Sequence, residues 1–211
     1  MTRLWPALLA GLAVGVPQSA AAYDRLPTPL ARLSPAYFAG KVRISEDPLG
    51  ETVTFSTYEG YQRGRSLKGA YAADVHLRAH VDRGNGRVTW QVWHDLITIR
   101  GHKAVVAVEY RAGGIWRVVR PSAVHHGFSH CPPTDAAGSC NQVTRIAFEL
   151  PETAVREIAA AGRGGAQQPW QLRFKDASGR DVTGGIAPAE VAGLVAALDA
   201  WRETRTAHRE N

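Results

Sequence analysis

The chain has 211 residues, of which 45% are apolar and 21% are charged, with a formal net charge of +6 at neutral pH. This composition excludes a disordered chain of low hydropathy and high charge, and the length suits one domain with a sizeable core. The lysines and arginines are scattered, and no basic run is interleaved with aromatic residues, so we expect no nucleic-acid partner.

Residues 1–22 have the pattern of a secretory signal peptide. Arg3 makes the start basic, an apolar stretch follows, and small residues precede a predicted cleavage after Ala22. The apolar stretch is shorter than the roughly 20 residues that a membrane span needs, and no later segment is apolar enough to span. We therefore expect a periplasmic or secreted mature chain whose charge falls by one, from +6 to +5, because Arg3 is removed.

The mature chain is predicted to hold one β-rich domain over residues 41–202. A Pro- and Ala-rich arm over residues 23–40 precedes the domain. Residues 203–211 are expected to form a flexible tail, since Ala207 is the one apolar residue that could anchor them.

Apolar and polar residues alternate along most of the domain, which is typical of strands with one buried face. Asn85-Gly86 and Gly113-Gly114 predict hairpin turns, because tight turns need residues that accept positive φ. Strands at this spacing predict an antiparallel β-sandwich or a partly open barrel. The predicted strands cover residues 52–55, 75–81, 88–93, 104–110, 115–120, 143–150, 170–176 and 180–185.

Two segments are predicted to be helical. Residues 151–162 begin with Pro151 and end at Gly162, as a short helix commonly does. Residues 188–202 carry apolar side chains at helical spacing, which predicts an amphipathic helix. We expect this C-terminal helix to pack on the sheet, and the alternative is a docking helix for a partner.

Cys131 and Cys140 are the only cysteines, and an exported chain meets an oxidising compartment, so we expect them to form a disulfide. For a loop of this size the bond stabilises the fold by about 2–3 kcal/mol. A catalytic redox pair is the alternative. Such pairs usually lie two residues apart at the start of a helix, whereas eight residues separate these two.

A metal site is a further alternative for the segment that contains the cysteines. His125, His126 and His130, together with Cys131 and Cys140, are nitrogen and sulfur groups of the kind that bind zinc. A zinc-binding cysteine must be a thiolate, however, and export favours the disulfide instead. We therefore expect no bound metal or other cofactor.

Residues Ser129, His130 and Cys131 resemble part of the active-site motif of L,D-transpeptidases, exported enzymes that crosslink peptidoglycan. That motif has a glycine before its cysteine, with an apolar residue and an arginine after it. Here the glycine is missing and Pro132-Pro133 follow the cysteine, so the resemblance does not predict this activity.

The polar face of residues 75–95 contains the main candidate binding residues. A two-residue turn at Asn85-Gly86 would place three pairs opposite one another: His80 and Gln91, Arg78 and Trp93, and His76 and Asp95. Arg78 on Trp93 would make a cation–π contact, and His76 with Asp95 could be a general base and its orienting carboxylate. His76 and His80 lie about 13 Å apart on a strand, so they cannot share one metal ion.

No catalytic constellation emerges from the sequence. There is no phosphate-binding glycine loop, no GxSxG element, no HExxH pair and no obvious pair of carboxylates. We therefore expect a binding module that recognises an envelope component or a protein through Arg78, Trp93 and the segment 125–140. One alternative is an envelope hydrolase that uses histidines as acid–base groups, with candidates His76, His94, His125, His126 and His130. The other alternative is a histidine-rich metal binder.

The segment LRAHVDRGNGRVTWQVW, followed by a second hairpin, a two-cysteine segment and a terminal helix, resembles a loosely defined group of uncharacterised exported bacterial proteins. The resemblance covers residues 75–198. It implies the fold and no activity, and it assigns no site residue.

The intact mass of protein recovered from an exporting host tests the predicted signal-peptide cleavage and the predicted disulfide together. The full-length chain has a mass of 22.8 kDa. We expect the measured mass to be lower by the mass of residues 1–22, and by that of two hydrogen atoms, which are lost when the cysteines form a disulfide. A full-length mass, or two thiols that react with iodoacetamide without prior reduction, would contradict export with oxidation.

Overall fold

A computed structural model describes residues 25–58, 60–61, 75–98, 101–129, 131 and 140–209. The predicted signal peptide, His130 and the interior of the disulfide loop lie outside the described residues. Within the described ranges, no helix has both the length and the apolarity that crossing a membrane requires.

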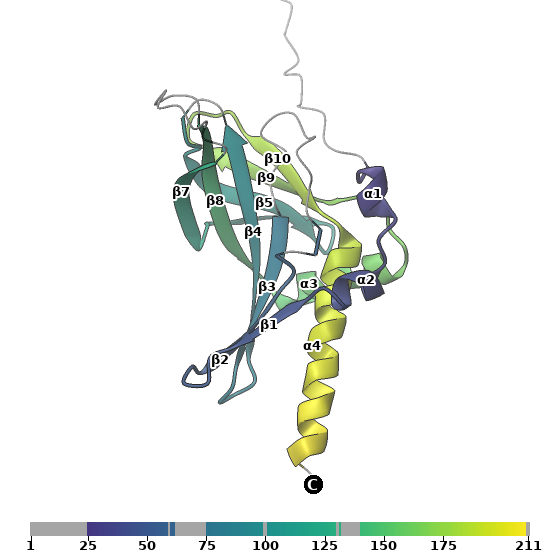
Figure 1. The fold of residues 1–211 in the computed structure, drawn as a ribbon. Coiled ribbons are helices and arrows are strands. Elements are labelled where there is room, and N and C mark those ends of the chain that lie inside the picture. Colours follow the sequence, from purple (N-terminus) through teal and green to yellow (C-terminus); the bar gives the residue numbers. More distant parts are fainter. Residues whose placement is uncertain are drawn as a thin grey trace, which may run out of the picture.

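Two antiparallel sheets form the body of the protein (Figure 1), so the prediction of a mainly β, sandwich-like fold is confirmed. Sheet A runs in the order β1 (Arg43–Glu46), β2 (Thr52–Ser56), β3 (Val75–Asp82), β4 (Val88–Thr98), β8 (Asn141–Leu150) and β7 (Ala123–Ser129). Sheet B runs in the order β10 (Val182–Ile186), β9 (Trp170–Asp176), β5 (Val105–Ala112) and β6 (Ile115–Val119).

The core lies between the two sheets and continues under the helices. Phe148 of sheet A packs against Phe174 of sheet B with ring centroids 6.5 Å apart, and Tyr110 stacks on Phe148 at 6.4 Å. At the end away from sheet B, the long helix α4 (Pro188–Arg209) covers β2 and β3, where Trp201 contacts Phe55 edge-on at 5.3 Å. Burial of these large rings supplies much of the hydrophobic stabilisation.

The described part of the chain contains four helices besides the sheets. The predicted helices correspond to α3 (Glu152–Arg163) and α4, which pack against each other. The apolar stripe of α4 is buried as expected: Val191, Leu194, Val195 and Leu198. The helix continues to Arg209, into the segment expected to be a flexible tail.

The N-terminal arm contains the short helices α1 (Thr28–Ala31) and α2 (Pro35–Ala39). The Ser34 hydroxyl caps α2 by accepting a hydrogen bond from the backbone N–H of Tyr37 at 3.2 Å. Phe38 of α2 is fully buried next to α4, so the arm is packed against the long helix (Figure 1).

The two central hairpins had been predicted, but the register of the first was wrong. β5 and β6 turn at Gly113-Gly114, both with positive φ, as expected. Between β3 and β4, however, the loop spans Arg83–Gly86, and Asp82 pairs across it with Arg87. The Asp82 carboxylate accepts hydrogen bonds from the backbone N–H groups of Gly84 and Asn85. These bonds stabilise the four-residue loop relative to the predicted two-residue turn.

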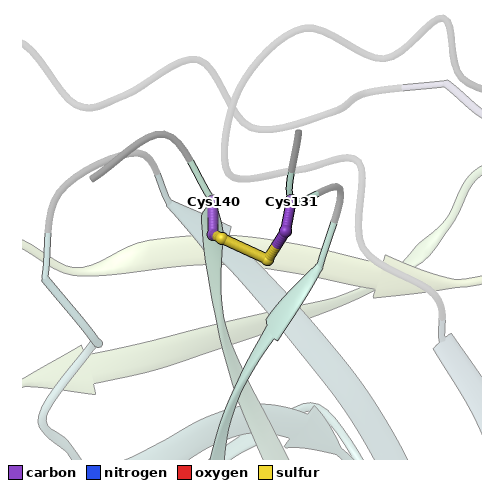
Figure 2. The surroundings of a disulfide bond; sticks show 2 residues. All are labelled: Cys131 and Cys140. Atoms are coloured by element: carbon purple, nitrogen blue, oxygen red, sulfur yellow. A yellow bond between two sulfur atoms is a disulfide. The ribbon is translucent and has the colours of Figure 1, made fainter. Parts of the chain in front are cut away.

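The predicted disulfide between Cys131 and Cys140 is present and joins the neighbouring ends of β7 and β8 (Figure 2). Strand β7 itself had not been predicted, since residues 123–129 lie outside the predicted strands. Because consecutive side chains of a strand point to opposite faces, His125 and His126 diverge instead of forming one histidine cluster.

Close packing of α2 on α4 depends on the absence of a side chain at Gly193. A Cβ atom there would lie 2.5 Å from the Cβ of Phe38 and 2.7 Å from the backbone oxygen of Pro35. These distances are far below van der Waals contact, so α2 would have to move away from α4.

We expect Gly193→Ala to lower the free energy of unfolding by about 1–3 kcal/mol through overpacking. Urea denaturation followed by circular dichroism measures the change. Gly127→Ala is the matched control, because a Cβ at Gly127 meets no atom within 4 Å. Equal loss in the two variants would contradict this account of the α2–α4 contact.

Candidate functional site

A group of aromatic and basic side chains lies on the face of sheet A that points away from sheet B. We call it the Trp93 cluster, and it consists of Tyr58, His76, Arg78, Trp93 and His125. Its members come from β3, β4, β7 and the residues that follow β2. The cluster contains His76, Arg78 and Trp93, which the sequence had singled out on β3 and β4, together with His125, but it does not contain the fourth candidate of these strands, Asp95.

The strand register explains why one indole can reach across this face. Trp93 pairs with His76 on one side and with Ala147 of β8 on the other. Ala147 is fully buried, and its methyl group leaves room for the Trp93 ring to extend over β8. The ring thereby reaches His125 of the edge strand β7, which pairs with the neighbouring Arg145.

The rings form a ladder across the strands. His76 and His125 both lie parallel to the Trp93 ring, each with its centroid 6.2 Å from that of the indole. Tyr58 contacts the far side of His76 edge-on at 4.9 Å. The guanidinium carbon of Arg78 lies 4.4 Å from the Trp93 centroid, so the predicted cation–π contact is present, although the two residues are diagonal and not opposite.

Hydrogen bonds hold the indole in place. The Trp93 Nε1–H donates to Gln91 Oε1 at 3.1 Å, and the same oxygen lies 3.2 Å from His80 Nε2. His80 Nδ1 lies 2.9 Å from the Thr54 hydroxyl. These contacts form a consistent chain if His80 carries its proton on Nε2, with Nδ1 accepting from Thr54. Burial is the largest influence on His80 and lowers its pKa, which favours this neutral form.

Asp95 does not assist His76, which corrects the predicted pair of a general base with its carboxylate. The Asp95 carboxylate instead receives two hydrogen bonds from Arg145 of β8, from Nε to Oδ1 and from Nη2 to Oδ2, both 2.7 Å long. Two parallel bonds of this length make a strong and directional ion pair. The predicted pairing failed because the β3–β4 register is shifted by two residues and places Trp93 opposite His76.

His76 is neutral and buried. The residue is 2% exposed. Neither nitrogen of its ring has a hydrogen-bond partner among the described residues. Burial, followed by the charges of Arg78 and Arg145, lowers its pKa from 6.5 to about 3.

Arg78 and Arg145 make the cluster electropositive. Both charges act on His76, and the charge on Arg145, after burial, also lowers the pKa of Arg78. Asp95 offsets part of the charge of Arg145 through its ion pair, whereas Arg78 has the indole face as its principal neighbour. The arrangement therefore presents ring faces together with a guanidinium on the outer side of a sheet.

His94 and His126, the other candidate histidines that the structure describes, lie outside the cluster. His126 points to the opposite face of β7, where its ring stacks on His102 at 4.5 Å with Phe128 nearby. His94 is buried on the inner face and contacts Phe174. Among the residues that the structure describes, no three His, Cys, Asp or Glu side chains gather closely enough to hold a metal ion.

Sequence reasoning missed Tyr58 and Arg145. Tyr58 follows the short strand β2, and nothing in the local pattern indicates that it contacts His76. Arg145 occupies a polar position in a strand that had been predicted, so its outward direction was predictable. Its partner was not, because Asp95 lies fifty residues earlier in the chain.

Comparison with protein-family models, with curated proteins and with solved structures gives no match for this chain. The function must therefore be argued from the geometry of the cluster.

The low pKa of His76 predicts a pH-dependent stability. The unfolded chain binds a proton at His76 below about pH 6.5, while the folded chain does so only below about pH 3. The free energy of unfolding should therefore fall as the pH is lowered through this range, with a slope that approaches about 1.4 kcal/mol per pH unit. Above pH 6.5 the contribution is constant.

Urea denaturation of the wild type and of His76→Phe at pH 4.5, 5.5 and 7 measures this effect. We expect the stability of the variant relative to the wild type to increase as the pH falls. Leu77→Val, on the same strand, removes no titratable group and should give an offset that does not change with pH. A constant difference between His76→Phe and the wild type would show that His76 is not held neutral.

Proposed function

We propose that the protein is an exported, non-catalytic β-sandwich module that binds an acidic component of the cell envelope through the Trp93 cluster. One observation carries the proposal: on the outer face of sheet A, the Arg78 guanidinium lies 4.4 Å from the centroid of the Trp93 ring, and the imidazoles of His76 and His125 lie parallel to that ring.

The chemistry of the cluster favours a ligand with both an apolar face and a negative charge. Ring faces stack on the flat C–H surfaces of sugars and on apolar side chains, while a guanidinium binds a carboxylate or phosphate. Arg78 and Trp93 provide both groups side by side. An envelope glycan or peptide with acidic substituents combines these features.

Rigidity of the platform also supports a binding role. The indole is fixed by its hydrogen bond to Gln91, lies across the small Ala147 and is flanked by His76 and His125. A surface whose side chains are already ordered loses little entropy when a ligand binds. A half-buried indole that is already ordered on the outer face of a sheet suits a recognition surface for this reason.

The same contacts argue against the hydrolase alternative. Asp95 is engaged by Arg145, so it is not the orienting carboxylate of His76. His76 is buried with a pKa of about 3, which makes it a weak base. Of the candidate histidines that the structure describes, His76 and His125 are separated by the Trp93 ring on the outer face of sheet A, while His94 and His126 lie on its other face, so they do not converge around one reacting group.

Co-sedimentation with isolated envelope fragments tests the proposal. We expect Arg78→Ala combined with Trp93→Ala to lower the apparent affinity at least tenfold, because a cation–π pair and a stacking surface are removed together. Added salt should weaken the binding of the wild type, since part of the attraction is electrostatic.

The matched control is Tyr37→Ala combined with Arg32→Ala. Both residues are exposed on the N-terminal arm, and the pair removes one aromatic ring and one positive charge outside the Trp93 cluster and strand β6. This control should bind as the wild type does. Unchanged binding by the Arg78/Trp93 variant, or an equal loss in the control, would refute the proposed surface.

A further inference from the structure

Among the described residues, strand β6 is an edge of sheet B with no further strand beside it. It is the last strand of that sheet among the described residues, with β5 as its neighbour on one side. Three of its apolar side chains are largely exposed: Ile115 at 57%, Trp116 at 55% and Val118 at 64%. An edge strand of this kind presents main-chain N–H and C=O groups that can pair with another extended segment.

The exposed side chains occupy both faces of the strand. Trp116 and Val118 point outward with the polar face of sheet B, where Val118 pairs with Glu109. Ile115, Arg117 and Val119 point to the other face, but only Val119 packs against the core. The strand therefore extends past the region that sheet A covers, and its apolar groups meet water.

Charge on and beside the strand is positive. Arg117 is the only charged residue of β6, it is exposed, and it forms no ion pair with any described residue. The following Arg120 is also exposed. The nearest carboxylates are already engaged, since Glu109 contacts Arg173 at 3.6 Å and Lys175 at 3.9 Å, and Glu157 accepts the backbone N–H of Gly113 at 2.8 Å.

This charge disfavours a second copy of the chain as the partner. In an antiparallel pair that uses the whole of Ile115–Val119, the central residue of each strand faces its counterpart. Arg117 would then lie directly opposite Arg117 of the other copy, and like charges in that position are destabilising. A segment with a carboxylate at the same position would be attracted instead.

We propose that β6 is a docking site for an extended peptide segment of another protein that alternates acidic and apolar side chains. The segment adds to sheet B as a strand next to β6. Its apolar side chains cover Trp116 and Val118, and its carboxylates face Arg117. Main-chain pairing supplies affinity and the side chains supply selection, as in other cases of strand addition. This site is independent of the Trp93 cluster on sheet A.

Fluorescence anisotropy with a labelled eight-residue peptide of alternating valine and glutamate tests the proposal on the mature chain. We expect saturable binding, and at least tenfold weaker binding of the peptide in which lysine replaces glutamate. Arg117→Glu should reverse this preference, so that the lysine peptide binds more tightly than the glutamate peptide. Arg163→Glu, an exposed position on α3, makes the same change of net charge and should leave the preference unchanged.

A second variant tests the main-chain pairing. In an edge strand, every second N–H group points away from the neighbouring strand. Ala112 and Ile115 flank the two-residue turn and pair with each other, so the N–H groups of Ile115, Arg117 and Val119 face β5. The N–H group of Val118 therefore points away from β5. Val118→Pro removes the donor that faces the peptide and spares the pairing with β5. We expect at least a tenfold loss of affinity, whereas Val118→Thr, which keeps the donor, should lose less.

Several results would overturn the proposal. These are no saturable binding of the glutamate peptide, an unchanged preference in Arg117→Glu, or a wild-type dimer in light scattering that Arg117→Glu abolishes. Because these experiments use defined peptides and variants of sheet B, their failure would leave the proposed role of Arg78 and Trp93 standing, and the reverse also holds.

Discussion

The antiparallel pairing of β4 with β8 joins two segments about fifty residues apart, from Trp90 opposite Leu150 to Thr98 opposite Gln142. This register places Arg145 beside Asp95 and Ala147 beneath Trp93 on the outer face. On the inner face it places Ile146 and Phe148 in the core. A slip of one residue would turn every β8 side chain to the other face, so the core and the Trp93 cluster depend on the same ladder of hydrogen bonds.

The two proposed surfaces use different physical properties of the β-sandwich. On sheet A, recognition depends on side chains that neighbours hold in a fixed arrangement, with Trp93 at its centre. On sheet B, the proposed recognition depends on the main-chain groups of β6 that pair with no described strand, and on the charge of Arg117. The two proposals are physically independent, because the residues of one proposed surface do not contribute to the other.

Much of the fold was predictable from local patterns. Alternation identified most strands, and the helical spacing of Val191, Leu194 and Val195 identified α4, because burial of one face requires these periods. The prediction failed where a local contact or an edge position decided the outcome. The Asp82 carboxylate selected a longer β3–β4 loop than Asn85-Gly86 alone suggested. Strand β7 was missed because side chains on both of its faces are exposed, which leaves no alternation to detect.

The sequence by itself determined that two cysteines form the disulfide, that the fold is mainly β, and that Arg78 and Trp93 lie on the same face of one hairpin. Strand periodicity and the small number of cysteines suffice for those conclusions. Only the tertiary structure decided that Asp95 pairs with Arg145, that His125 rather than His126 stacks on Trp93, and that no described strand lies beside the outer edge of β6. These depend on which strands lie side by side and in which register, and contacts between residues distant in sequence leave no local pattern.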